Sequence, residues 1–191
     1  MLLIPPAVYF VLSITSAIDI GVRHILPIYP FLYVAAAATL ASLSWRRAAR
    51  FAMMGLGVLQ IAECASITPH YLAFFNAASG GPGNGPRYLV DSNIDWGQDL
   101  KKLAAWLRAH GTHSAVVLYF GNAPMPYYGI DAKPFPAPDD ERGWQTLDDF
   151  AAVSVTPLYG VYVPPEMFAR LRRIQPVAKA GWSMYVYDLR K

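Results

Sequence analysis

The stretch YLVDSNIDWGQDL, from Tyr88 to Leu100, gathers several side chains that could do chemistry. Asp91, Asn93 and Asp95 offer oxygen atoms at alternate positions, and Asp99 adds a further carboxylate. Oxygen donors at this spacing can bind Ca²⁺, and a pair of carboxylates can serve as acid and base. An acidic residue just before a helix can instead cap it. These chemistries need different structures, so the surrounding elements decide among them.

A calcium loop fits the stretch only in its first half. Asp91, Asn93 and Asp95 match the first three ligand positions of an EF-hand loop. That loop then needs glycine at its sixth position and glutamate at its twelfth, where this chain has Trp96 and Lys102. A lysine removes the bidentate carboxylate, so we expect no metal site in this stretch and no cofactor. A divalent metal elsewhere stays open.

Helix capping explains more of the stretch. Asp95 and Gln98 have the spacing of a capping box, in which the two side chains satisfy free backbone N–H groups at the start of a helix. Asp99 would add negative charge to the first turn, which the helix dipole favours. The sequence therefore predicts that Asp95 caps a helix continuing through DLKKLAAWLRAHG.

Capping leaves part of the stretch unexplained. The preceding residues RYLVD, 87–91, are interpreted as a strand, and ligands bind beyond the carboxyl ends of strands in open α/β sheets. We therefore predict a contact with an acceptor or with another domain at this position, made by Asp91, Ser92, Asn93, Asp95 and Trp96. Asp91 and Asp95 could also form an acid–base pair, although no spacing rule demands it.

An aromatic segment precedes this stretch. His70, Tyr71, Phe74 and Phe75 follow a long apolar run. This pattern is typical of an aromatic belt where a helix leaves a membrane. His70 and Tyr71 are kept as further candidates for the acceptor or domain contact.

Three apolar runs in the first 68 residues set the frame for these candidates. The chain is 54% hydrophobic and 15% charged, with a mean hydropathy of +0.26. Runs near 2–18, 25–43 and 51–68 approach the roughly 20 residues that a helix needs to cross a bilayer. The sequence therefore predicts three transmembrane helices in residues 1–68, with the lipid bilayer as a partner.

The charged loops between the runs predict the orientation of the chain. The loop SWRRAAR, residues 44–50, carries three arginines, which the positive-inside rule assigns to the cytoplasm. The segment after residue 68 is then expected outside the bacterial cytoplasmic (inner) membrane, as part of a multi-pass protein. A net charge of +3 gives no reason to expect nucleic acid as a partner, and the single Cys64 excludes a disulfide framework.

Three ionisable residues lie at the predicted outer membrane face. Arg23 and His24 precede the second apolar run, and Glu63 interrupts the third. One interpretation is a Glu63–Arg23 pair that fixes helix packing. The other is an anion site in which Arg23 and His24 bind a phosphate, since the planar guanidinium can hold two oxygens at once.

The remaining sequence alternates strand and helix patterns. Residues 69–86 are expected to form an aromatic and Gly/Pro-rich connector, and residues 87–191 a small extracytoplasmic α/β domain with a mostly parallel sheet. The predicted strands are 87–91, 114–120, 158–163 and 182–189, and the predicted helices are DLKKLAAWLRAHG and PPEMFARLRRIQP. The fold class is thus membrane α-helical followed by α/β.

Three segments together resemble a known family. GVRHILPIYPFLYV, HYLAFFNAASGGPGNGPRYLVDSNIDWGQDLKKLAAWL and FAAVSVTPLYGVYVPPEMFARL are similar to the C-terminal part of bacterial membrane glycosyltransferases. These are the protein-mannosyltransferase-like and aminoarabinose-transferase-like proteins of glycosyltransferase family 39. The stretches DSNxDWGQDL and RHxLPxYP carry the resemblance most specifically, and it covers nearly the whole chain.

The resemblance implies a GT-C architecture and a polyprenyl-phosphate sugar as donor. The catalytic carboxylate of that family lies in an early extracytoplasmic loop, and Asp19 in DIGVRH does not resemble that loop. The chain is therefore expected to be a C-terminal portion, fragment or subunit without the catalytic loop, acting with a separate multi-helix subunit. In such an enzyme Arg23, His24 and Glu63 would contact the lipid phosphate.

Two other functions stay open at this point. The chain could be a non-enzymatic, membrane-anchored binding module whose outer domain recognises a glycan or a protein partner. A small hydrolase using Asp91 and Asp95 is the third hypothesis, and the absence of a nucleophile elbow argues against it.

Overall fold

The computed structural model describes residues 1–16, 21–42 and 46–190, and the chain divides into two compact units. The first unit is Met1–Ser66 and the second is Ile67–Lys191. Asp19 and Ser44, which the sequence analysis discussed, lie outside the described residues.

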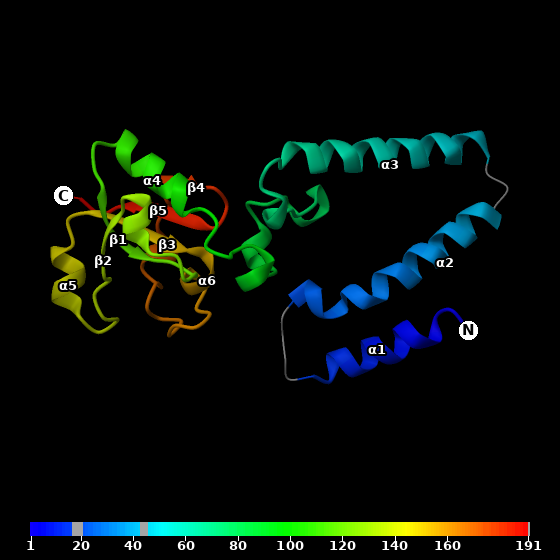
Figure 1. Ribbon diagram of the computed structural model, residues 1–191, viewed down its shortest axis with the longest axis horizontal. Coiled ribbons are helices and arrows are strands. Elements are labelled where there is room, and N and C mark those ends of the chain that lie inside the picture. The colour runs from blue at the N-terminus through cyan, green and yellow to red at the C-terminus, as the bar shows by residue number, and fades with distance from the viewer. Residues whose placement is uncertain (17–20, 43–45, 191) are drawn as a thin grey trace. The chain divides into compact units, whose positions relative to one another are not determined.

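The N-terminal unit is helical (Figure 1). It contains α1 (Ile4–Ile14), the 3-10 helix η1 (Gly21–Ile28), which leads directly into α2 (Tyr29–Ser42), and α3 (Arg47–Ser66). Pro27 and Pro30 lack the backbone N–H that an α-helix needs, which accounts for the 3-10 turns before α2.

Two helices of this unit are long and apolar enough to cross a membrane: Gly21–Ser42, with 22 residues, and Arg47–Ser66, with 20 residues. Helix α1 has 11 residues, fewer than the roughly 20 that a span requires. The first predicted span, near residues 2–18, therefore stays a prediction. In the most apolar segment of each long helix no residue is buried. Phe51, Val58 and Ile61, for example, expose most of their surface.

The second unit is built on one mixed, five-stranded sheet with the order β2-β1-β3-β5-β4. The strands are β1 (Ser114–Leu118), β2 (Asp131–Lys133), β3 (Phe150–Ser154), β4 (Ala178–Ala180) and β5 (Met184–Asp188). Strand β1 pairs in parallel with β2 and β3, whereas β5 pairs antiparallel with β3 and β4. The predicted mostly parallel sheet is thus corrected to a mixed one, because the chain returns from β4 to β5 through a tight turn at Gly181–Ser183.

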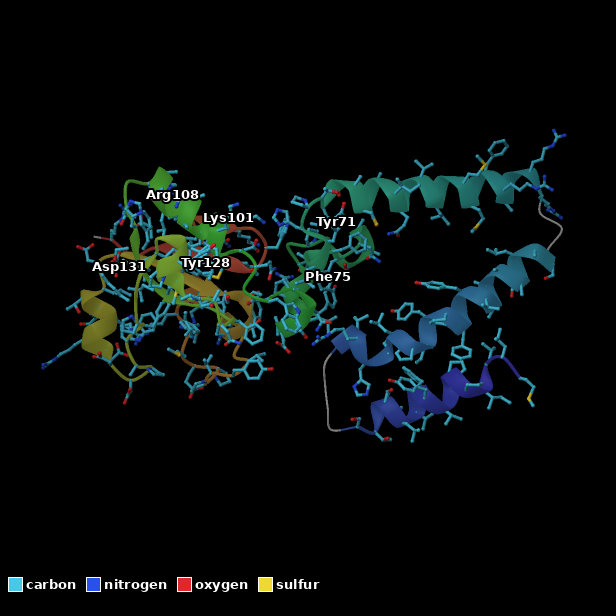
Figure 2. All side chains as sticks on the ribbon, in the orientation of Figure 1. Tyr71, Phe75, Lys101, Arg108, Tyr128 and Asp131 are labelled. Carbon is cyan, nitrogen blue, oxygen red and sulfur yellow. The ribbon has the colours of Figure 1, made fainter. Side chains whose placement is uncertain are left out.

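Alternate residues of the central strands face two separate cores. Phe150 and Ala152 of β3 face a core that includes Leu103 and Leu107 of α4 (Leu100–Ala109). The opposite face of β3 packs in a second core with Phe168 and residues of the loops that follow. Helix α4 lies along the sheet in Figure 1, and Figure 2 labels its Lys101 and Arg108, both of which are exposed.

The remaining helices are short. They are α5 (Glu141–Thr146) and α6 (Val155–Leu158), with 3-10 turns η2 (Tyr71–Ala73), η3 (Ala77–Ser79), η4 (Gly85–Arg87), η5 (Asp91–Asn93), η6 (Met125–Tyr128) and η7 (Leu171–Arg173).

Three predicted elements of this unit are wrong. Residues 87–91 form no strand: Arg87 ends the 3-10 turn η4, Asp91 begins η5, and residues 88–90 connect the two. Residues 158–163 leave the sheet, because Gly160 and Tyr162 have positive φ angles; the strand lies earlier, at β3. The segment 164–176, predicted as a helix between prolines, contains only the 3-10 turn η7. The predicted helix and strands at α4, β1 and β5 are confirmed.

Candidate functional site

The carboxyl ends of β1 and β3 lie side by side, since Leu118 pairs with Val153 in the parallel register. Beyond these ends the backbone N–H of Phe120 donates to Ser154 Oγ at 3.0 Å. The same end of the sheet meets the loop before α4, because the Asp95 carboxylate lies near the hydroxyls of Ser154 and Thr156. The stretch thus lies beyond the ends of β1 and β3, whereas the strand 87–91 from which the contact site was predicted is absent. The contact itself stays a prediction.

Gly97 lets the loop approach the end of β1 closely. It has a φ of +71°, and a Cβ atom placed on it would lie 2.8 Å from the carbonyl oxygen of Phe120. The same Cβ would lie 2.9 Å from the Tyr119 ring. Only glycine combines this left-handed backbone with so close a contact.

Asp95 caps a turn and not the helix, which corrects the capping-box prediction. Its Oδ1 accepts from the N–H of Gly97 at 3.0 Å. Gln98 stabilises the same turn, because its Oε1 accepts from Trp96 N–H at 2.7 Å and its Nε2 donates to the Ile94 carbonyl at 2.8 Å. Helix α4 begins at Leu100, and its N-cap residue Asp99 makes no side-chain capping bond.

The Asp99 carboxylate instead holds the turn between β4 and β5. Asp99 is 1% exposed, and its Oδ2 accepts from Ser183 Oγ at 2.8 Å and from the N–H groups of Trp182 and Ser183 at 3.2 Å each. Its Oδ1 accepts from Lys102 Nζ at 2.8 Å. The charged side chain before α4 thus binds a turn that lies more than 80 residues later along the chain.

The Asp95 carboxylate is buried with one of its two oxygens unpaired among the described residues. It is fully buried, and its Oδ2 has no hydrogen-bond partner among residues 1–16, 21–42 and 46–190. Burial raises the pKa of Asp95 above its ordinary value, and the Gly97 N–H and the hydroxyls of Ser154 and Thr156 lower it by a smaller amount. These hydroxyls lie near the carboxylate without reaching Oδ2 in hydrogen-bonding geometry.

Asp95→Asn should stabilise the α/β unit more at pH 7 than at pH 4. A carboxyl whose pKa is raised in the folded state contributes stability that is complete below the unfolded pKa and is lost as pH rises through the folded pKa. Each pKa unit of that shift corresponds to about 1.4 kcal/mol of folding free energy that the aspartate loses at high pH. Asparagine does not ionise, so the variant avoids this loss. Urea denaturation of both proteins at the two pH values, followed by tryptophan fluorescence, measures the difference. A difference that does not change with pH would contradict this assignment.

An aromatic pocket of about 420 Å³ opens beside this loop. Its lining residues come from the loop before α4, the segment after β1 and the turn after α6: Trp96, Tyr119, Phe120, Gly121, Asn122 and Tyr162. The rings of Phe120 and Tyr162 stack with an interplanar angle of 3° and a centroid distance of 5.6 Å. Trp96 is 56% exposed and Tyr162 is 74% exposed, so two large aromatic side chains present much of their surface to solvent.

A strained backbone conformation occurs at Tyr162, which lines this pocket, and a left-handed one at the neighbouring Asp91. Asp91 has a φ of 57° and Tyr162 a φ of 64°, and they are the only non-glycine residues with positive φ among those the structure describes. Their side chains also meet, because Tyr162 OH donates weakly to Asp91 Oδ2 at 3.5 Å. Aspartate tolerates the left-handed region, whereas for tyrosine it costs energy. Such residues cluster at ligand sites, where the surrounding structure holds them in place.

The neighbouring candidates Ser92 and Asn93 support the loop. Ser92 is buried, and its carbonyl accepts from Trp96 Nε1 at 3.0 Å, which orients the indole ring. Asn93 Nδ2 donates to the carbonyl of Val90 at 3.1 Å. These two residues therefore position Trp96 and the loop that carries Asp91.

His70 and Tyr71 lie elsewhere in the second unit. His70 Nδ1 is 2.8 Å from Lys102 Nζ, and Tyr71 OH is 2.9 Å from Thr68 Oγ1. Figure 2 labels Tyr71 and Phe75 in the segment that follows α3. His70 lines a separate pocket of about 250 Å³ with Asp99, Lys102 and Trp182, and neither candidate lines the aromatic pocket.

The proposed phosphate contacts belong to the N-terminal unit. Arg23 and His24 lie in η1, where the His24 carbonyl accepts from Tyr9 OH at 3.0 Å. Glu63 lies near the end of α3, and its carbonyl accepts from Ser66 Oγ at 2.7 Å. Their role as a lipid-phosphate site stays a prediction.

Sequence reasoning missed Phe120, Asn122 and Tyr162. Phe120 and Asn122 directly follow β1, so the rule that ligands bind beyond strand ends could have found them. Tyr162 had no such indication, because its segment reads as a strand and its left-handed backbone is visible only in three dimensions.

Comparison of the chain with protein-family models, curated proteins and solved structures finds no match. Within the described residues no group of three or more His, Cys, Asp or Glu side chains could hold a metal ion.

Proposed function

We propose that the α/β unit binds a carbohydrate at the aromatic pocket. The observation that carries the proposal is the pairing of the strained Tyr162 and Asp91 beside the exposed Trp96. A sugar ring has apolar C–H faces and a polar hydroxyl edge, so it needs aromatic surface and hydrogen-bond acceptors together. Trp96 and Tyr162 supply the first, and the Asn122 amide supplies the second. The Asp91 carboxylate does not line the pocket but lies beside it, 3.5 Å from Tyr162 OH.

We further propose that the chain is a C-terminal portion or subunit of an integral membrane glycosyltransferase, with the pocket contacting its acceptor outside the membrane. Two long apolar helices with exposed apolar side chains support a membrane location, because so much exposed apolar surface requires a lipid or protein cover. The resemblance of DSNxDWGQDL and RHxLPxYP to that family supports the activity. The donor would be a polyprenyl-phosphate sugar, and a multi-helix subunit would supply the catalytic loop.

The pocket itself suits binding more than catalysis. Asp95, the second carboxylate of the stretch, is fully buried and does not line the pocket. Neither Asp91 nor Asp95 lines the pocket, so they do not offer the pair of carboxylates that glycoside hydrolysis requires, which argues against the hydrolase hypothesis. This observation also favours the alternative function, a membrane-anchored module that binds a glycan without transferring a sugar. Sugar transfer on co-expression with a multi-helix subunit distinguishes the enzyme from the module.

Tyr162→Ala should weaken glycan binding by roughly tenfold or more, because it removes one stacking surface and the contact to Asp91. The full chain in micelles of a sugar-free polyoxyethylene detergent is screened on a glycan array, and the best-bound glycan is then titrated by tryptophan fluorescence. Tyr127→Ala is the matched control, since Tyr127 is 82% exposed and does not line the pocket. Equal affinities for the two variants, or an array without a bound glycan, would refute the carbohydrate site.

A further inference from the structure

A second pocket of the α/β unit has a different chemistry from the aromatic pocket. Its volume is about 430 Å³. Four segments line it, namely the Gly-rich loop together with η4, the end of α6, the chain from η7 through β4, and strand β5. The lining residues are Gly83, Asn84, Arg87, Leu158, Tyr159, Arg172, Ile174, Gln175, Pro176, Lys179, Tyr185 and Tyr187.

Three cations face this pocket without a counter-ion. Arg87, Arg172 and Lys179 all line it, and no aspartate or glutamate is among the lining residues that the structure describes. The ion pairs of the described chain join Lys102, Lys133, Arg170 and Arg190 to acids and involve none of the three. Like charges collected in one hollow repel each other, so an anion would relieve their repulsion.

The structure holds two of these cations in place without neutralising them. Arg172 donates to the carbonyls of Leu158 at 2.7 Å and Pro165 at 2.5 Å, which fixes the guanidinium while leaving its charge uncompensated. Lys179 Nζ lies 4.5 Å from the centre of the Tyr185 ring. Partial burial also lowers the pKa of Lys179, the shift expected for an ammonium group that lacks an acidic partner.

Buried tyrosines add hydrogen-bond donors to the pocket. Tyr185 is 7% exposed and Tyr187 is 2% exposed, and both side chains line the pocket. In the part of the chain that the structure describes, neither hydroxyl makes a hydrogen bond. Neither hydroxyl oxygen is completely buried, so both can reach a ligand in the pocket. Burial of both rings raises the pKa of each phenol, which keeps the hydroxyls protonated and able to donate.

We propose that this pocket binds a phosphate group. Two arginines and a lysine match the charge of a phosphate, the planar guanidinium can donate to two of its oxygens, and the tyrosine hydroxyls can donate to the others. A carboxylate would have fewer oxygens than the pocket has donors. The volume leaves room for a further group beside the phosphate. This site is independent of the aromatic pocket, with which it shares no lining residue.

The test titrates the full chain in maltoside micelles, which contain no phosphate, with inorganic pyrophosphate by calorimetry. Lys179→Gln and Arg87→Gln should each weaken binding by about tenfold, the factor for one lost charge-assisted hydrogen bond. Arg173→Gln makes the same change in net charge at an exposed residue next to Arg172 that does not line the pocket, so it should change the affinity by less than about twofold. Circular dichroism verifies that each variant is folded.

A second titration separates the sources of the phosphate. Saturable pyrophosphate binding that depends on Lys179 and Arg87 supports a soluble phosphate ligand. If pyrophosphate does not bind, and micelles doped with phosphatidylglycerol change the fluorescence of wild type but not of Lys179→Gln, a lipid headgroup is the ligand. Binding of neither probe, or equal loss in Arg173→Gln and Lys179→Gln, overturns the proposal.

Discussion

Asp99→Ala is expected to lower the unfolding free energy of the α/β unit by about 3–5 kcal/mol, the range for removing one member of a buried charged network. The substitution leaves Ser183 Oγ and the N–H groups of Trp182 and Ser183 without their acceptor. A buried donor without a partner costs about 1–3 kcal/mol. Lys102 adds little to the loss, because its side chain is 42% exposed and water can solvate it.

The experiment compares urea denaturation of the full chain and its variants by tryptophan fluorescence. Four of the five tryptophans, including Trp182 beside Asp99, belong to the α/β unit. Asp99→Asn keeps one oxygen acceptor and should fall between wild type and Asp99→Ala. Glu141→Ala is the control, because Glu141 is 64% exposed and its pair with Arg170 lies at the surface, so it should cost less than about 1 kcal/mol. Similar losses for Asp99→Ala and Glu141→Ala would contradict the role of Asp99.

Gly97→Ala should destabilise the same unit by about 2–4 kcal/mol and remove glycan binding at the aromatic pocket. The left-handed φ of +71° alone costs a side chain about 1–2 kcal/mol. The new Cβ would also lie 2.8 Å from the Phe120 carbonyl oxygen, so the loop must move away from β1. Trp96 and Phe120 line the pocket from the two sides of this contact, and separating them opens it.

Gly111→Ala isolates the backbone part of this effect, so its difference from Gly97→Ala gives the steric part. Gly111 has a φ of +74°, nearly the same as Gly97, yet an added Cβ would meet nothing within 4 Å. Gly111→Ala should therefore cost only the backbone strain, about 1–2 kcal/mol, and leave glycan binding unchanged. Denaturation and glycan titration of the two variants measure both effects. Equal stability losses together with unchanged binding would show that the contact between Gly97 and Phe120 does not shape the pocket.

The parts of the fold that were predictable from sequence have strong periodic patterns. Helix α4 repeats buried leucines at helical spacing, and β1 is a continuous apolar run. The central strand β3 was missed because its sequence FAAVS contains two alanines, which have low strand propensity. Both alanines are fully buried. The aromatic and β-branched segment 158–163 has higher strand propensity, but the positive φ of Tyr162 takes it out of the sheet.

The sequence predicted some residues of the candidate site and missed others. Asp91 and Trp96 stand in a short stretch whose composition predicted a contact, but the rule on strand ends was applied to residues 87–91, which form no strand. Their partner Tyr162 is 71 residues away from Asp91 along the chain, so no local pattern links the two. Asp95 was predicted to cap a helix but is a buried turn residue. Its position depends on Ser154 and Thr156, which only the fold brings near it.

The two outer strands of the sheet have a consequence for solubility. Strands β2 and β4 lie at the edges, and each is three residues long. An edge strand offers unpaired N–H and C=O groups that can template aggregation with another chain, and short edges bearing lysine resist it. Lys133 ends β2 and Lys179 is the middle residue of β4, so both edges have this protection. Edge-to-edge growth of the sheet into larger assemblies is thereby disfavoured.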